Sequence, residues 1–284
     1  MARPPEAPVP QDMTVLERLP GVVIQEKTQG IDAIMAAFGL PSEKENVYLV
    51  KAMPENQRLA TYHGEPGTWS LSSVNALPGV YVVQEKSDDD LRAILACCGG
   101  LNLRPLNLHF YQGKERMYRV DRDCKMGGCC GCPLEMRLHA KDGTLQGAVV
   151  EEFDDCCFNC YEQFCMCIVR HKILVGTTPN NRLLHKYSLV YPMCCCGRVN
   201  NCFGSTCCKP HLFIDIEKPD GTLVAVAQKT YGTNTWDDCY RCWFRFSNYV
   251  LPFPPEATQQ ERVLLLTGIL NMEYAYFSRQ GGEN

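Results

Sequence analysis

The apolar stretch at residues 263–277 limits the folds open to this chain more than any other feature. Its 15 residues are interrupted by Asn271 and Glu273, and residues 256–262 open the same helix with acidic side chains. A helix that crosses a bilayer needs about 20 nearly uninterrupted apolar residues, whereas a shorter helix that is apolar all round is usually buried in a protein. We therefore predict a core helix, with a membrane span as the alternative. The expected core residues are Val263, Leu264, Leu266, Ile269, Leu270, Tyr274 and Phe277.

Most of the remaining chain has the pattern of short β-strands. Two tight-turn sequences, at residues 141–144 and 218–222, contain the Asp-Gly pair that allows positive φ between two strands. Many short strands at roughly even spacing predict a β-barrel or a sandwich. The predicted strands are residues 48–51, 106–111, 117–120, 135–139, 148–152, 167–172, 185–190, 211–217, 223–229 and 242–246.

An internal repeat occupies the front of the chain. The sequence Leu19-Pro-Gly-Val-Val-Ile-Gln-Glu-Lys27 returns as Leu77-Pro-Gly-Val-Tyr-Val-Val-Gln-Glu-Lys86, and both copies precede a helix-like stretch, at residues 31–38 and 91–96. Because the first copy stops early, we predict that residues 15–76 are a partial duplication that packs extra strands against a main domain at residues 77–278. This segment is either structural or a partner or dimerisation surface.

The two ends of the chain carry little pattern. Residues 1–14 form a proline-bearing arm, which is either a poorly ordered terminus or a docking ligand for a protein partner, and residues 279–284 form a tail. The start lacks the apolar region of a secretory signal, so we expect a protein of the cytosolic side. The formal net charge of -4 and the absence of a Lys/Arg run make nucleic acid an unexpected partner.

The chain contains 19 cysteines in clusters. Because cytosolic thiols stay reduced, and because the count is odd, a disulfide scaffold is not expected. Three uses remain, namely a structural metal site, lipid attachment and small buried apolar residues.

An ordered set of segments resembles the phospholipid scramblase family over residues 78–277. The set begins with Pro78-Gly79 and the cysteine-bearing hairpin at residues 123–131, and it ends with Phe253-Pro254 before the apolar helix. Between them lie the segments at residues 134–138, 142–143, 156–167, 194–197, 213–216 and 226–232.

The resemblance implies a mostly β fold. This fold is a closed antiparallel tubby-like β-barrel of about twelve strands around a buried hydrophobic C-terminal helix. The implied activity is the ATP-independent, bidirectional movement of phospholipids between membrane leaflets, without covalent chemistry. The expected location is the cytoplasmic face of membranes, the plasma membrane in particular. A non-transporting lipid- or protein-binding module of the same fold, tethered at membranes, is the alternative.

The resemblance places lipid attachment at one cysteine cluster. Scramblases carry acylated cysteines in the corresponding region, so palmitoylation is expected here. Neighbouring cysteines allow two acyl chains, and a single chain anchors only marginally. The candidate residues are Cys156, Cys157, Cys160, Cys165 and Cys167.

Metal binding is the competing use of these clusters. The pairs Cys129/Cys132, Cys157/Cys160 and Cys239/Cys242 have the spacing of zinc knuckles, so Zn²⁺ is a minor alternative. The family's acidic segment for Ca²⁺ retains only Glu256 here, and one carboxylate cannot supply the six to eight oxygen ligands of a tight site. The six histidines are expected to be structural, because no nucleophile signature accompanies them.

Overall fold

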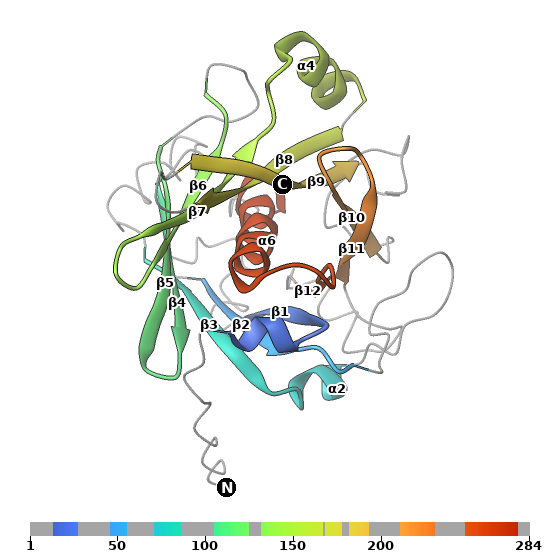
Figure 1. The fold of residues 1–284 in the computed structure, drawn as a ribbon. Helices are drawn as coiled ribbons and strands as arrows, with labels where there is room; N and C mark the ends of the chain where they lie inside the picture. Colours follow the sequence, from blue (N-terminus) through green and yellow to red (C-terminus); the bar gives the residue numbers. More distant parts are fainter. Residues whose placement is uncertain are drawn as a thin grey trace, which may run out of the picture.

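The computed structural model describes residues 14–27, 46–55, 71–86, 105–124, 132–166, 168–177, 182–192, 211–230 and 248–277. In this part of the chain, twelve antiparallel strands form a closed barrel. Each strand pairs with its neighbours in sequence, and β1 closes the barrel against β12 (Figure 1). The strands are β1 (Gly21–Lys27), β2 (Val47–Ala52), β3 (Gly79–Glu85), β4 (Leu106–Gln112), β5 (Glu115–Arg122), β6 (Glu135–Ala140), β7 (Leu145–Glu151), β8 (Ile168–Thr177), β9 (Arg182–Pro192), β10 (His211–Glu217), β11 (Leu223–Thr230) and β12 (Asn248–Pro252).

The alternation of buried and exposed side chains produces this sheet. In β4, Leu106, Leu108 and Phe110 point into the barrel and are buried, whereas Asn107 and His109 point outward. A strand with this period of two buries one face and leaves the other to solvent. The predicted closed antiparallel barrel is confirmed, while the predicted strand at residues 242–246 lies outside the described residues.

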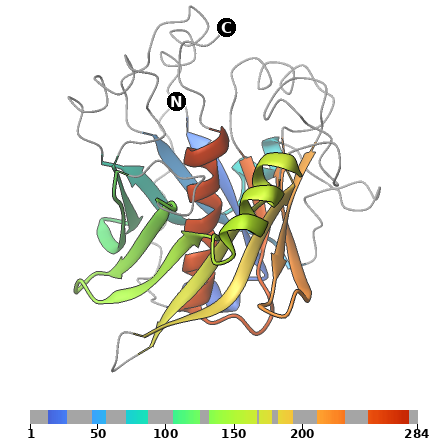
Figure 2. The same cartoon turned by 90° about the horizontal axis from the view of Figure 1, so that it is seen from above.

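The C-terminal helix α6 (Gln259–Met272) lies inside the barrel and ends in a π-helical turn, η3 (Glu273–Phe277) (Figures 1 and 2). Thr258 caps its first turn, since the Thr258 hydroxyl accepts from Glu261 N and Glu261 Oε2 accepts from Thr258 N. Of the predicted core residues, Val263, Leu264, Leu266, Ile269, Leu270 and Tyr274 are buried, and the side chain of Phe277 lies outside the described part.

The position of α6 decides between the two interpretations of the apolar stretch. Every side chain from residue 261 to residue 275 is buried, which is the environment predicted for a core helix. Within the described residues, we find no helix that combines the length and the apolar character required to cross a bilayer.

The front segment is part of the barrel and does more than add strands beside it. β1 and β2 lie between β12 and β3, so the boundary expected between residues 76 and 77 falls inside the closed sheet. Strands β3–β12 alone would leave two open edges. The short helix η1 (Val15–Arg18) also closes one end of the barrel, because Leu16 N donates to Gln259 Oε1 at 2.9 Å.

The guanidinium of Arg262 completes this closure. It donates to the carbonyl oxygens of Leu16, Leu19 and Ala257 at 2.5, 2.7 and 2.7 Å. The helix-like stretches at residues 31–38 and 91–96 lie outside the described residues, so the duplication itself stays a prediction.

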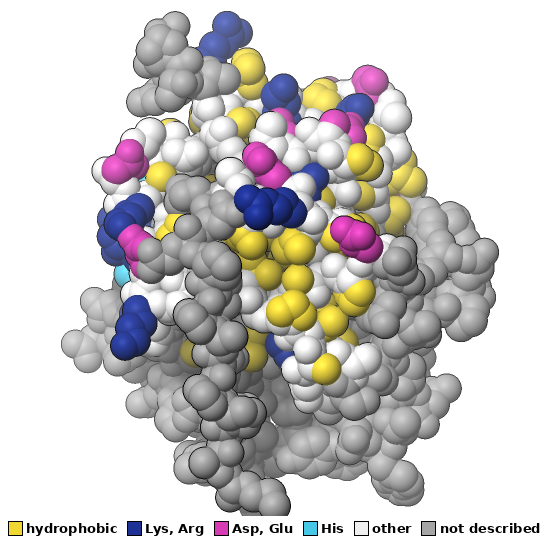
Figure 3. All heavy atoms as spheres, turned by 60° about the horizontal axis from the view of Figure 1, so that its bottom comes forward, with side chains coloured by type: hydrophobic (Ala, Val, Ile, Leu, Met, Phe, Trp, Pro, Cys, Tyr) yellow, Lys and Arg dark blue, Asp and Glu magenta, His cyan; other side chains and the backbone are white. Residues whose placement is uncertain are grey.

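A short helix, α2 (Leu71–Asn75), covers part of the outer surface of the barrel. Its Val74 packs with Val23 of β1 and Val250 of β12, and Met53 and Leu77 border this group. Figure 3 views the molecule from the side on which α2 lies in Figure 1, and hydrophobic side chains gather in the middle of that face.

The two ends of the barrel are built differently. At one end, β4–β5, β6–β7 and β10–β11 are joined by tight turns with positive-φ glycines, at Gly113, Gly143 and Gly221, and the same end also holds the long β2–β3 connection that contains α2. At the other end, the connections β1–β2, β3–β4, β5–β6, β7–β8, β9–β10 and β11–β12 are longer. We call these the turn end and the long-connection end. The η3 turn lies at the long-connection end, where it contacts the last residues of β3 and β7.

Candidate membrane-attachment site

A ten-residue helix, α4 (Cys156–Cys165), connects β7 to β8 at the long-connection end. Asp155 caps it, since its carboxylate accepts from Phe158 N at 3.1 Å. The helix stands outside the barrel wall in both ribbon views (Figures 1 and 2). Most of the cysteines predicted to be acylated therefore lie on a helix rather than in a loop.

The side of α4 that faces the barrel is polar. Asn159 and Glu162 are buried there, and Gln163 Nε2 donates to Glu151 Oε1 at 3.3 Å. Arg170 of β8 donates to both oxygens of Glu162, with Nε–Oε2 at 3.0 Å and Nη2–Oε1 at 3.3 Å. Burial alone lowers the pKa of the Arg170 guanidinium, but the bonds to Glu162 outweigh it and raise the pKa overall. A cavity of about 10 Å³, room for one water molecule, lies among these side chains.

The opposite side of α4 is apolar and carries the thiols. Phe158 and Tyr161 are 55% and 54% exposed, and Met166 after the helix is 38% exposed. Cys157 and Cys165 are exposed as well. A helix on the surface of a globular protein normally buries its apolar side and exposes its polar side. The polarity of α4 is therefore inverted, and its apolar side suits a lipid interface better than water.

The structure brings together three of the five predicted acylation residues. Cys157 and Cys165 are exposed free thiols and Cys160 is a partly exposed one. The side chain of Cys156 and the whole of Cys167 lie outside the described part. Thiols in such positions can be reached by an acyl-transfer enzyme, and they lie beside aromatic side chains that favour the membrane interface.

The positions of the cysteines along the chain give a result that the sequence alone did not reveal. All 19 lie in the connections β3–β4, β5–β6, β7–β8, β9–β10 and β11–β12, which begin and end at the long-connection end. Among the elements that the structure describes, neither the strands nor α6 contain a cysteine. The described core of the barrel is thus packed without cysteine. The clustering of the thiols becomes visible only once the strand order is known.

The metal sites considered from the sequence receive no geometric support. Within the described ranges, no three side chains of His, Cys, Asp or Glu are grouped to hold a metal ion. Cys157 and Cys160 lie on α4, while Cys129, Cys239 and Cys242 fall outside the described residues. Zinc therefore stays a prediction.

Glu256, the carboxylate left in the expected calcium segment, lies at the turn end. Its Oε1 is 2.9 Å from Lys218 Nζ, and this hydrogen bond lowers the pKa of the Glu256 carboxyl. A carboxylate already paired with a lysine is a poorer ligand for a cation. Ca²⁺ binding by this segment stays a prediction as well.

Three buried glutamates, which sequence reasoning missed, connect the barrel wall to the end of α6. Glu273 Oε2 accepts from Lys229 Nζ at 2.9 Å and from the Tyr249 hydroxyl. The Tyr274 hydroxyl donates to Glu85 Oε2 at 3.1 Å. The third link is at Glu151, whose Oε1 accepts from the Tyr276 hydroxyl at 2.9 Å.

Glu151 also joins this buried layer to α4, because the same oxygen accepts from Gln163. One carboxylate therefore positions both the end of the core helix and the candidate attachment helix. The sequence does contain a signal for the buried glutamate contacts. Glu151 and the other two glutamates are charged residues next to or within apolar segments, where a charge needs a partner.

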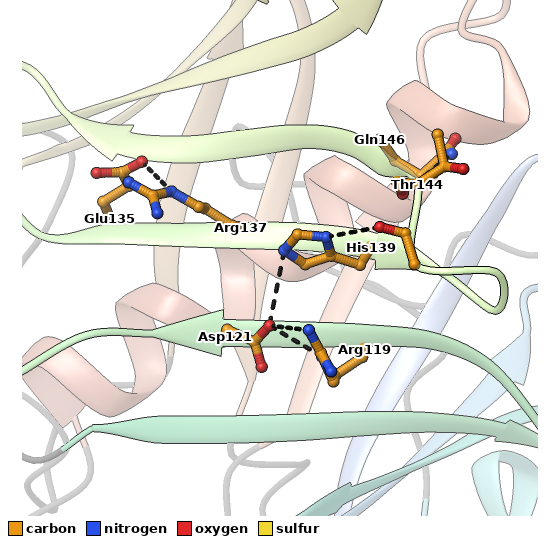
Figure 4. Close-up of polar contacts among 8 residues, drawn as sticks. Arg119, Asp121, Glu135, Arg137, His139, Thr144 and Gln146 are labelled. Carbon is orange, nitrogen blue, oxygen red and sulfur yellow. Dashed lines mark hydrogen bonds and ion pairs between the residues drawn. The ribbon is translucent and has the colours of Figure 1, made fainter. Parts of the chain in front are cut away.

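A second polar group lies on the outer surface of β5 and β6 (Figure 4). Arg119 Nη2 is 2.9 Å from Asp121 Oδ2, and His139 Nε2 is 3.6 Å from the same oxygen. Arg137 pairs with Glu135 on its own strand at 2.7 Å. These side chains are partly or largely exposed, and such ion pairs contribute little to stability. We assign them no chemistry.

Comparison of the chain with protein-family models, with curated proteins and with solved structures found no match. The scramblase resemblance therefore stays a prediction. The closed barrel and the packed C-terminal helix rest on the structure itself.

Proposed function

We propose that this protein is a phospholipid scramblase held at the cytoplasmic face of a membrane by acylated cysteines of α4. The observation that supports attachment is the inverted polarity of α4, whose exposed side carries Cys157, Cys165, Phe158 and Tyr161. The activity is inferred from the sequence resemblance. Lipid movement down a gradient needs no nucleotide, and the sequence has no Gly-rich phosphate loop.

The strength of the attachment follows from the number of acyl chains. Each buried CH₂ contributes about 0.8 kcal/mol, and one chain gives only marginal, reversible binding. Two or more acylated thiols on one helix would anchor the protein stably. The exposed rings of Phe158 and Tyr161 add interfacial affinity.

Attachment is tested by thioester exchange and membrane fractionation in cells. We expect hydroxylamine-sensitive acyl groups on wild-type protein and their loss when all five cluster cysteines are changed to Ser, with a shift of the protein from membrane to supernatant. The matched control is Cys124→Ser with Cys132→Ser, which changes two exposed thiols outside α4. Membrane retention of the five-cysteine variant would contradict the anchor.

Transport is tested in liposomes that contain a fluorescent phospholipid in both leaflets. If the protein scrambles lipid, an external reductant will quench the probe of the inner leaflet as well as that of the outer leaflet. The assay is run with and without Ca²⁺, because Glu256 is paired with Lys218. Quenching that stops at the outer leaflet under both conditions, with the protein bound to the vesicles, would refute scrambling.

One observation favours the alternative of a tethered, non-transporting module. The lumen of the barrel is filled by α6, whose side chains are buried against the wall. A polar headgroup would need a wet route across about 30 Å of hydrocarbon, and the described interior is occupied. Vesicle binding without exchange of the inner-leaflet probe is the result this second function predicts.

A further inference from the structure

A hydrogen bond to Glu151 of β7 helps to hold the end of the core helix inside the barrel. Glu151 Oε1 accepts from the Tyr276 hydroxyl of η3 at 2.9 Å. The η3 segment is a π-helical turn, and such turns are rare and often occur at functional sites. We call the hydrogen bond from Tyr276 to Glu151 the latch.

His171 of β8 lies beside the latch but is not part of it. His171 is the direct cross-strand neighbour of Glu151, and the Cβ atoms of such pairs are about 5 Å apart. The ring centroids of His171 and Tyr276 are 5.9 Å apart. His171 is fully buried, yet neither of its ring nitrogens has a hydrogen-bond partner in the described part of the chain. Leaving a buried polar group without a partner is unfavourable, so this arrangement needs an explanation.

Glu151 is within reach of two donors that can compete for its carboxylate. In the structure, Glu151 accepts from Tyr276, and His171 stays without a partner. In the alternative arrangement, a ring N–H of His171 donates to Glu151, and Tyr276 loses its acceptor. Protonation of His171 favours this alternative, because a hydrogen bond between an imidazolium and a carboxylate is stronger than one from a neutral donor.

Inside the barrel, the ionisable groups around His171 leave Glu151 as its partner. Among the described residues, Glu151 is the charged group that acts on His171. From η3, the ionisable neighbour is Tyr276. Arg122 of β5 and Tyr191 of β9 are ionisable groups that act electrostatically on Tyr276. A protonated His171 would therefore pair with the acceptor of the latch.

On the outside of the barrel, the charged neighbours of His171 have partners of their own. Arg170 and Lys172 flank His171 in β8, and they lie on the outer side because side chains alternate along a strand. Arg170 pairs with Glu162 of α4. Lys172 pairs with Asp154. These two ion pairs lie on the other side of the sheet from the latch.

We infer that His171 and Glu151 form a proton-operated switch that releases the end of the core helix from the barrel wall in acid. When His171 binds a proton, it takes Glu151 from Tyr276, and η3 loses its contact with β7. The inference concerns the interior of the barrel. It depends neither on membrane attachment nor on lipid transport.

The size of the effect follows from the protonation of His171 in the two states. Burial lowers the pKa of His171 to about 4 in the latched state, whereas a histidine paired with a carboxylate has a pKa of about 6.5 or higher. The proton therefore binds more tightly to the released state, and acid shifts the population toward release. Between pH 7 and pH 5, the released fraction should rise about twentyfold.

Hydrogen exchange of the full-length protein at pH 7 and pH 5 tests the switch. Exchange is expressed as protection factors, which remove the intrinsic effect of pH on amide exchange. We expect the protection of η3 to fall about twentyfold at pH 5, while β4 and the centre of α6 keep their protection. Equal losses in all three elements would show global acid unfolding alone and would overturn the inference.

Three variants separate the switch from a general loosening of η3. His171→Leu removes the titrating ring and Tyr276→Phe removes the latch, so each should abolish the difference in protection between the two pH values. Tyr274→Phe is the matched control, because it removes the hydroxyl that the same turn donates to Glu85. It should keep the full difference. A difference that persists in His171→Leu or Tyr276→Phe, or that disappears in Tyr274→Phe, would contradict the switch.

The titration of His171 gives a second measurement that does not depend on exchange. In protein labelled with ¹³C at histidine, the resonance of His171 is identified by its absence from His171→Leu. We expect the apparent pKa of His171 to rise in Tyr276→Phe, because Glu151 no longer has to leave Tyr276 before it pairs with the imidazolium. The same apparent pKa in wild-type protein and in Tyr276→Phe would overturn the inference.

Discussion

The buried histidine of β8 shows how a single residue sets a dependence on pH. His171 is fully buried, neither ring nitrogen has a hydrogen-bond partner, and its ring meets that of Tyr276 at 5.9 Å. Burial lowers the pKa of His171 to about 4, although the nearby charge of Glu151 opposes the shift. The imidazole is therefore neutral in the folded protein near pH 7.

We expect the free energy of unfolding to fall as the pH drops from about 6.5 to about 4. In this window the unfolded chain binds a proton at residue 171 and the folded chain does not, so acid favours unfolding, by up to about 3 kcal/mol. His171→Leu should flatten this slope and stabilise the protein by about 1–2 kcal/mol at pH 7, because it removes unpaired buried polar atoms. Urea unfolding at several pH values measures both effects, and an unchanged slope in the variant would contradict the assignment.

The buried pair Lys229–Glu273 permits a second prediction. Both side chains are at most 3% exposed. Burial lowers the pKa of Lys229, and Glu273 opposes this shift. Lys229→Met should destabilise the protein by about 3–5 kcal/mol, because it leaves a carboxylate buried without its cation. The double variant Lys229→Met with Glu273→Met should recover much of that loss in urea unfolding, and additive losses would show that the two residues are not coupled.

At the scale of single elements, the sequence predicted most of the strands and the core helix because their patterns are local. The period of two in β4 and the all-round apolar character of residues 263–275 require no knowledge of distant residues. The start of α6 could also have been placed, since Thr258 and Glu261 have the spacing of a capping box.

The site was only partly predictable, for a physical reason. The cysteine cluster of α4 was visible in the sequence. The inverted polarity of this helix was not, because it depends on which side of α4 contacts Arg170 and Glu151 of the barrel wall. The closure of the barrel by β1 and β12 is also a long-range pairing. Local patterns carry no information about such contacts.

Gly147 in β7 allows a prediction about the packing of single elements. A Cβ atom at Gly147 would lie 2.2 Å from the carbonyl oxygen of Leu174 in β8 and 2.7 Å from Leu264 Cδ1 in α6. Gly147→Ala should therefore destabilise the protein by about 3 kcal/mol, because strand and helix must both move. Gly79→Ala in β3 is the matched control, since nothing lies within 4 Å of its Cβ position. Thermal unfolding compares the two, and equal melting temperatures would contradict the close packing at Gly147.

The whole molecule depends on its first strands as much as on its last helix. β1 and β2 complete the sheet between β12 and β3. Leu16 of η1 accepts from Arg262 through its carbonyl oxygen and donates from its N–H to Gln259 Oε1. The main domain expected from the sequence, residues 77–278, therefore lacks two strands of the closed barrel.

We expect a truncated chain of residues 77–284 not to fold as a stable monomer. It would expose the edges of β3 and β12 to other chains, and it would leave the buried guanidinium of Arg262 without two of its acceptors. Size-exclusion chromatography and thermal unfolding test this expectation. A monomer that unfolds cooperatively near the temperature of the full chain would contradict it.

The position of α6 at the end of the described chain also determines when the barrel can close during synthesis. This helix follows all twelve strands in sequence, and it supplies the centre around which they close. While a ribosome is still making the strands, their apolar sides have nothing to enclose, and emerging segments of this kind are prone to aggregate. We therefore expect closure of the barrel to wait until synthesis of α6 is complete.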